Sequence, residues 1–117
     1  MQPVADPRIR AVVAMSPASV MFTPESLARI TVPTLPCRAE DDRFLVPRFH
    51  VSWLVQNMPH IRGASVPLAS QFACMDTPSM PLMSPDGDVG TDAPGFDHSV
   101  FLEKLGLNLT AFFERVW

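Results

Sequence analysis

The sequence has little of what marks a disulfide-stapled, zinc-binding or nucleic-acid-binding chain. Its two cysteines, Cys37 and Cys74, are too few for a disulfide framework and lack the paired spacing of a zinc site. Nine Lys and Arg stand against 12 Asp and Glu, which gives a net charge of −3, and there is no basic stripe. Nucleic acid is therefore not an expected partner.

Long apolar runs and a secretory leader are also missing. The longest apolar runs, such as residues 11–15, are far shorter than a membrane span requires. The opening Met1-Gln2-Pro3 is not a charged region followed by an apolar one, so no secretory signal is predicted. We expect a cytoplasmic protein with reduced, mostly structural thiols and no membrane association.

The composition indicates one folded domain over residues 1–117. Hydrophobic residues make up 47% and charged residues 18% of the chain, which is unlike the composition of disordered proteins. A chain of this length can bury a single core. The 13 prolines are about twice the usual share, and their positions mark where regular elements end.

The first half of the chain predicts two strands separated by a short helix. Residues 9–15, from Ile9 to Met15, form a mostly apolar segment without alternation of apolar and polar residues, which is typical of a parallel strand covered on both faces. Thr23, followed by Pro24, is a helix-start signal. Residues 34–39 then predict a second strand, which is either at an edge or distorted at Pro36 because proline cannot donate a ladder hydrogen bond.

The second half predicts a helix, a short strand, a long loop and a final helix. Helical spacing of apolar residues extends from Pro47 to Asn57, and residues 64–67 predict a third strand. Residues 77–96 are too rich in proline and glycine for regular structure and form a long loop. Asp97 caps the last predicted helix, which runs to about residue 116. One stripe of this helix is apolar: Phe101, Leu105, Leu109, Phe112 and Val116.

The alternation of strands and helices predicts an α/β fold. About three parallel strands with flanking helices, followed by a long C-terminal helix, are expected.

Three segments in order resemble the C-terminal portion of an α/β-hydrolase of the dienelactone-hydrolase-like family. Residues 6–17 (DPRIRAVVAMSP) resemble the sixth strand of that fold. Residues 32–47, including the stretch AEDD, resemble the seventh strand and the loop that presents the catalytic acid. Residues 65–72 (SVPLASQF) resemble the eighth strand and the loop that carries the catalytic histidine. The resemblance implies a partial α/β-hydrolase fold and, for the family, ester or lactone hydrolysis.

The resemblance also implies that the catalytic machinery is incomplete. The family's nucleophile lies on a G-x-S-x-G turn that would precede Met1, and these 117 residues contain no such motif. The acid position corresponds to Asp42, with Asp41 as the alternate. Gln71 occupies the base position, where an amide cannot accept and return a proton. No cofactor or metal is predicted.

Several polar residues have simpler interpretations that stay open. Both aspartates are also suited to solvating a turn or capping a helix. His50 lies in the predicted helix after Pro47 and suits a partly buried or surface position, and the spacing places neither His60 nor His98 near Asp42. Cys74 is the nucleophile candidate nearest Gln71, although a buried inert thiol is the simpler interpretation. Asp86 and Asp88, with Asp92, are spaced like the carboxylate ligands of a calcium ion. The complete calcium-loop pattern, with its terminal glutamate, is missing, so a solvated turn is favoured.

Three functions remain as hypotheses. The first is a hydrolase-derived domain that is non-catalytic alone and forms a homodimer through the edge strand that runs from Ile9 to Met15, because an unpaired apolar edge recruits another chain. The second is the C-terminal half of a split ester or lactone hydrolase whose nucleophile comes from a partner chain. The third is a small-molecule binding module that uses a residual pocket near Asp42 and Gln71.

Overall fold

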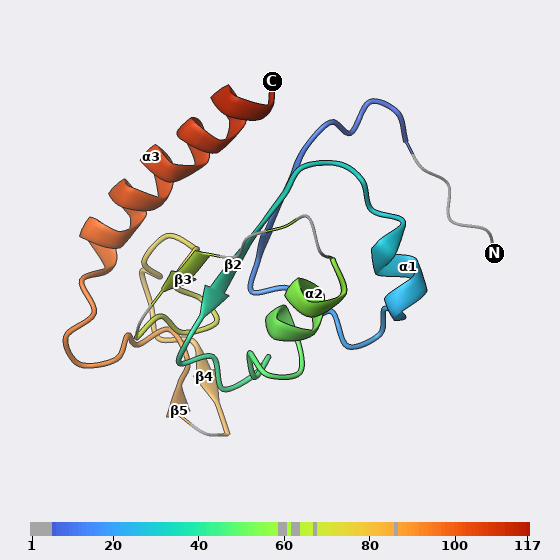
Figure 1. Ribbon diagram of the computed structural model, residues 1–117. Helices are drawn as coiled ribbons and strands as arrows, with labels where there is room; N and C mark the ends of the chain where they lie inside the picture. The colour runs from blue at the N-terminus through green and yellow to red at the C-terminus, as the bar shows by residue number, and fades with distance from the viewer. Residues whose placement is uncertain (1–5, 59–60, 62–63, 67, 86) are drawn as a thin grey trace.

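The computed structural model describes residues 6–58, 61, 64–66, 68–85 and 87–117 (Figure 1). The elements are, in chain order, β1 (Val12–Met15), α1 (Pro24–Ala28), β2 (Thr34–Ala39), α2 (Val51–Asn57), β3 (Ala64–Val66), β4 (Met83–Ser84), β5 (Gly87–Asp88) and α3 (His98–Val116). The chain is thus a small mixed α/β protein.

The main sheet has the order β1-β2-β3, and both pairings are parallel. Val12 of β1 lies opposite Thr34, and Cys37 of β2 lies opposite Ala64. β2 is the central strand of this sheet, and its residues Cys37 and Ala39 are buried in the core. The second sheet is the antiparallel pair β4-β5.

Pro36 is accommodated in the central strand because of where β3 begins. The backbone N–H groups of Val12 and Ser16 donate to the carbonyls of Pro33 and Cys37, on the β1 side of β2. Peptide groups alternate along a strand, so the nitrogen of Pro36 faces the opposite side. The pairing with β3 starts one residue later, at Cys37. The missing donor therefore interrupts neither ladder.

Helices α1 and α2 pack together next to β2 and enclose one of the two described cores. Thr23 caps α1 by accepting the N–H of Ser26 at 3.2 Å, and Pro24 occupies the first turn, as the sequence predicts. The indole Nε1 of Trp53 donates to the carbonyl of Phe22 at 3.0 Å and so joins α2 to the segment before α1. The buried members of this core are Leu27, Leu54, Met58 and Ile61.

Helix α3 lies on the side of the sheet away from α1 and α2 (Figure 1). Asp97 caps it by accepting the N–H of Val100 at 3.0 Å. The predicted stripe is its inward face: Leu105 and Phe112 are buried, and the other three members are partly buried. Near its start, Phe96 and Phe101 pack on a second core that consists of Ala39, Ala69 and Ala73. At its end, Arg10 stacks on the ring of Trp117.

The predicted bounds of two elements are wrong. The first strand begins at Val12 rather than Ile9, because Asp6 holds residues 6–9 in a turn by accepting the backbone N–H groups of Arg8 and Ile9. The second helix begins at Val51 rather than Pro47, because residues 46–50 form turns instead.

The segment 77–96 also differs from the prediction of a loop without regular structure, because it contains β4 and β5. The last residue of the predicted third strand, Pro67, lies outside the described residues. No helix in the described part of the chain is long and apolar enough to cross a membrane.

Candidate functional site

The C-terminal ends of β2 and β3 bring two of the predicted site residues together. After β3, Leu68 has a left-handed backbone conformation with φ of 61°, which is uncommon for a residue with a side chain. The carbonyl of the next residue, Ala69, accepts the N–H of Asp41 at 2.9 Å. The chain that follows β3 is thereby held against the chain that follows β2.

Asp42 is the buried acid of this site. Its exposed fraction is 5%, and one carboxylate oxygen accepts the backbone N–H groups of Phe44 at 3.0 Å and Leu45 at 2.8 Å. Aspartate forms such turns readily because its short side chain reaches the backbone two and three residues ahead. The loop that follows β2 is therefore organised around this carboxylate.

Gln71 contacts the same carboxylate. In the amide orientation that satisfies both groups, Nε2 of Gln71 donates to both oxygens of Asp42, at 3.2 Å to Oδ1 and more closely to Oδ2. The rings of Phe44 and Phe72, which neighbour the pair in sequence, meet edge to face with centroids 5.9 Å apart. The two residues that the resemblance implied for the acid and base positions are thus direct hydrogen-bond partners.

The chemistry of the Asp42–Gln71 pair is that of binding and positioning. A carboxylate beside an imidazole fixes the tautomer of the ring and stabilises its charged form. An amide nitrogen instead donates its hydrogen to the carboxylate without entering an acid–base equilibrium near neutral pH. The pair can hold two loops together, but it cannot relay a proton.

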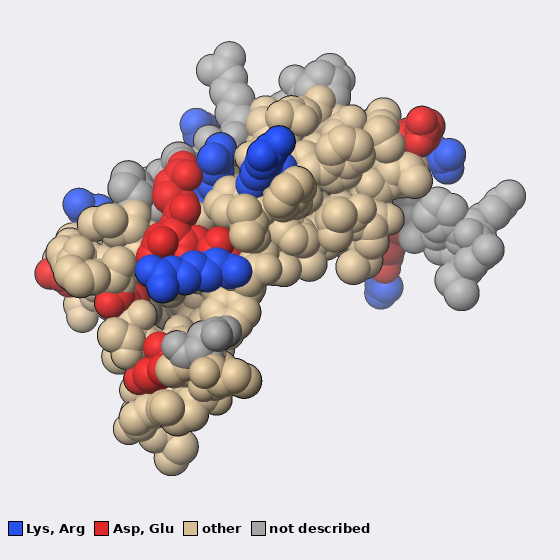
Figure 2. Space-filling model, turned by 90° about the horizontal axis from the view of Figure 1, so that it is seen from below, with Lys and Arg blue, Asp and Glu red and all other residues tan. Residues whose placement is uncertain are grey.

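Asp41, the alternate acid, has a different role. Its side chain is 41% exposed and forms an ion pair with Arg43 at 3.6 Å, while Arg38 pairs with Glu40 at 3.3 Å. Figure 2 looks toward the molecule from below and shows acidic side chains gathered in one patch with basic side chains against it. Surface pairs of this kind are screened by solvent and contribute little to stability. Of the two aspartates, Asp42 is the one that contacts Gln71.

Cys74 is placed in an environment that suppresses its reactivity. Burial, with a smaller contribution from Cys37, raises the pKa of the Cys74 thiol from 9.0 to about 11. Burial also raises the pKa of Cys37. Because the thiolate is the nucleophilic form, neither thiol is activated at neutral pH.

His50 forms contacts that hold two loops together. It lies at the N-cap of α2, where its Nδ1 accepts the N–H of Ser19 at 3.3 Å. Its backbone carbonyl accepts the hydroxyl of Ser19, a side chain that is fully buried. The hydroxyl is therefore not bonded to the imidazole. His60 lies outside the described residues.

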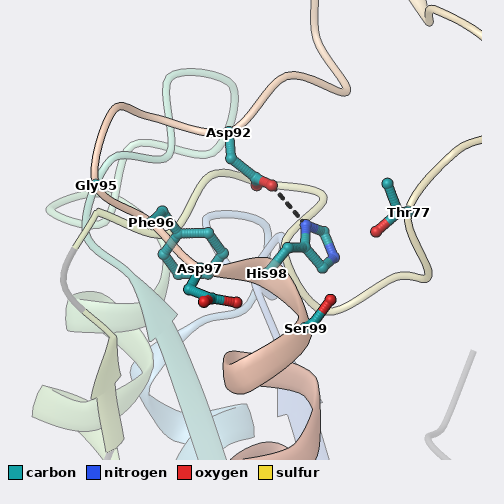
Figure 3. Close-up of a pocket in the computed structure, with 7 residues that line it drawn as sticks. All are labelled: Thr77, Asp92, Gly95, Phe96, Asp97, His98 and Ser99. Atoms are coloured by element: carbon teal, nitrogen blue, oxygen red, sulfur yellow. Dashed lines mark hydrogen bonds and ion pairs between the residues drawn. The ribbon is translucent and has the colours of Figure 1, made fainter.

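His98 belongs to an ion pair that the sequence did not reveal. Its Nδ1 lies 2.7 Å from Oδ2 of Asp92, and its Nε2 lies 2.8 Å from the carbonyl of Met75. Figure 3 shows the pair in a shallow pocket, with Thr77 and Ser99 near the ring and Phe96 beside it. No spacing rule links residues 75, 92 and 98, because the loop between them sets the contact.

The acidic residues whose spacing resembles that of calcium ligands form hydrogen bonds and an ion pair within their own part of the structure. The carboxylate of Asp88 accepts the N–H groups of Leu82 and Gly90 and the hydroxyl of Thr91, while Asp92 is paired with His98. These bonds lower the pKa of Asp88, most strongly the bond from Gly90. Asp86 lies outside the described residues. Among the others, no group of three or more His, Cys, Asp or Glu side chains is arranged to hold a metal ion.

Comparisons with protein-family models, with curated proteins and with solved structures find no match to this chain.

Proposed function

We propose that this chain is a hydrolase-derived domain that does not catalyse hydrolysis on its own. The observation that carries the proposal is the hydrogen bond from Gln71 to the buried carboxylate of Asp42. Asp42 follows β2 and Gln71 follows β3, which is the order of the acid and the base in the α/β-hydrolases that the sequence resembles. Glutamine in the second position leaves the site without a proton carrier.

The other potential catalytic groups support the same proposal. The hydroxyl of Ser19 donates to the carbonyl of His50, and the two ring nitrogens of His98 bond to the carboxylate of Asp92 and the carbonyl of Met75. The Cys74 thiol has a pKa of about 11, so the thiolate is scarce at neutral pH. The 117 residues contain no G-x-S-x-G turn.

The test is ester hydrolysis by the purified chain, with Cys74→Ala as the matched variant. We expect the wild type to release p-nitrophenol from its acetate ester no faster than Cys74→Ala and buffer do. Saturable turnover that Cys74→Ala abolishes would overturn the proposal. Turnover that arises only when a co-purifying chain is present would favour the split enzyme instead.

We further propose that the chain self-associates through β1. Val12 and Ser16 direct their N–H groups to β2, so the peptide groups of Val13 and Met15 point away from it. β1 is the terminal strand of its sheet among the described residues, and the Met15 side chain is 44% exposed. A second copy that pairs with this edge about a two-fold axis would satisfy these groups.

Proline substitutions at two adjacent positions of β1 test its outward edge and its pairing with β2 separately. Val13→Pro removes an outward N–H and is expected to convert a dimer into a folded monomer, as measured by sedimentation equilibrium with circular dichroism as the folding check. Ala14→Pro removes an N–H that faces β2 and is expected to destabilise the fold itself. A wild-type chain that stays monomeric at high micromolar concentration contradicts self-association and leaves the catalytic proposal untouched.

A further inference from the structure

The described residues of the segment 76–92 (76–85 and 87–92) form a lobe with its own internal bonds. β4 and β5 pair within it, and the carboxylate of Asp88 accepts hydrogen bonds from Leu82, Gly90 and Thr91. A side chain at Gly90 would meet Pro78 at 2.8 Å, so the two arms of the lobe approach closely there. In Figure 1 the hairpin extends beyond the end of the main sheet.

His98 joins both ends of this lobe to the start of α3. Met75, directly before the lobe, contributes its carbonyl at 2.8 Å from Nε2, and Asp92, its last residue, contributes Oδ2 at 2.7 Å from Nδ1. The His98 side chain is only 10% exposed. His98 lies 23 positions after Met75 and 6 positions after Asp92 in the sequence, and its ring lies between the lobe and the body of the protein.

Both partners of the ring are hydrogen-bond acceptors. A carbonyl and a carboxylate each require a hydrogen from the imidazole, and only the doubly protonated ring has two. A neutral ring would keep one bond and direct the lone pair of its other nitrogen at an oxygen. The geometry of His98 thus fits the imidazolium and penalises the neutral form.

We propose that His98 is a proton-operated clip, which fastens the lobe 76–92 to α3 when it is charged and releases the lobe when it loses its proton. Release would separate Asp92 and Thr77 from Phe96 and Ser99 and so open the pocket of Figure 3. The change on the protein is a single proton lost to solvent.

The charged groups around the ring favour its closed, protonated state. Asp92 and Asp76 act on it electrostatically, and Asp97 lies beside it at the N-cap of α3. The positive end of the α3 dipole and partial burial oppose the charge. The net effect raises the pKa of His98 above 6.5, chiefly through the bond to the Met75 carbonyl and then through Asp92.

The direction of the pH dependence follows from that raised pKa. The stabilisation of the closed lobe is fully present below the ordinary histidine pKa of about 6.5 and is lost as the pH rises through the pKa of the closed state. Between these two values, the ratio of closed to open lobe falls about tenfold for each pH unit. The clip is therefore closed in acid and opens on the alkaline side.

The experiment is an NMR titration of the whole chain, which follows the His98 ring and the ¹⁵N heteronuclear NOE of the Leu82 and Val89 amides. We expect the ring to titrate above about 6.5 and the NOE values to fall with the same midpoint. His98→Gln, which carries its two N–H donors on one nitrogen rather than on two ring nitrogens that face different acceptors, should show low NOE values at every pH. Asp92→Asn should lower the midpoint, whereas Asp97→Asn, which keeps the cap, should change it much less.

Two outcomes would overturn the clip. One is a His98 ring that titrates at or below about 6.5. The other is a lobe whose NOE values stay constant through the titration or are unchanged in His98→Gln. Circular dichroism of each variant separates release of the lobe from loss of the whole fold, because α3 and the main sheet keep their signals when only the lobe opens.

Discussion

Replacing Asp42 with alanine removes the acceptor around which the loops after β2 and β3 are organised. Three donors lose their partner: the backbone N–H groups of Phe44 and Leu45 and the Nε2 group of Gln71. The carboxylate is only 5% exposed and bonds all three donors, so its removal leaves each of them without its protein partner, which is destabilising.

The expected loss in the free energy of unfolding follows from those three hydrogen bonds. A donor that loses its partner costs about 1–3 kcal/mol, and the low end applies here because the neighbouring Phe44 side chain is 51% exposed, so water reaches the loop. We therefore expect Asp42→Ala to lower the free energy of unfolding by about 3 kcal/mol. Gln71→Ala should lower it by about 1 kcal/mol, and the double variant should reveal a coupling of similar size.

Urea denaturation followed by circular dichroism measures these changes, and Asp41→Ala is the matched control. Asp41 adjoins Asp42 in sequence, yet its side chain is 41% exposed and its ion pair with Arg43 is long, so its loss should change stability by less than about 1 kcal/mol. The reasoning is refuted if Asp42→Ala is no more destabilising than Asp41→Ala, or if the effects of Asp42→Ala and Gln71→Ala are simply additive.

Three further predictions concern other parts of the chain. Cys74, with its pKa raised from 9.0 to about 11, should react with a disulfide reagent at pH near 8 about a hundredfold more slowly than in urea-unfolded protein; equal rates would contradict the raised pKa of this partly buried thiol. Asp97→Ala removes the cap on Val100 and should cost about 1 kcal/mol in urea denaturation, whereas no change would show that α3 does not depend on it. Leu27→Ala, at a side chain 1% exposed, should cost about 2–5 kcal/mol, and a loss below 1 kcal/mol would mean that the α1–α2 core is loosely packed.

Local signals predicted the fold best where one residue decides the structure. Thr23 and Asp97 are helix caps by the chemistry of their side chains, and the spacing of Leu105 and Phe112 identified the inward face of α3. The first strand was placed too early because the turn at Asp6 overrides the apolar character of Ile9. The apolar pattern alone did not show that a turn, rather than a strand, would form at residues 6–9.

The site was partly predictable for a related reason. The resemblance assigned Asp42 and Gln71 to the loops after two successive strands, and these strands pair in parallel, so the two side chains meet where the strands end. The pairing of His98 with Asp92 and Met75 depends on how the lobe folds back on α3. That path is set by tertiary contacts across a proline-rich segment, which has no periodic pattern.

The most direct test of the central claim is the pKa of an imidazole introduced by Gln71→His. If position 71 faces the Asp42 carboxylate, the introduced ring should titrate by NMR above the ordinary value of about 6.5. Adding Asp42→Asn should bring the value back down, and neither variant should hydrolyse an ester. An imidazole that titrates at its ordinary value and ignores Asp42→Asn would contradict the account.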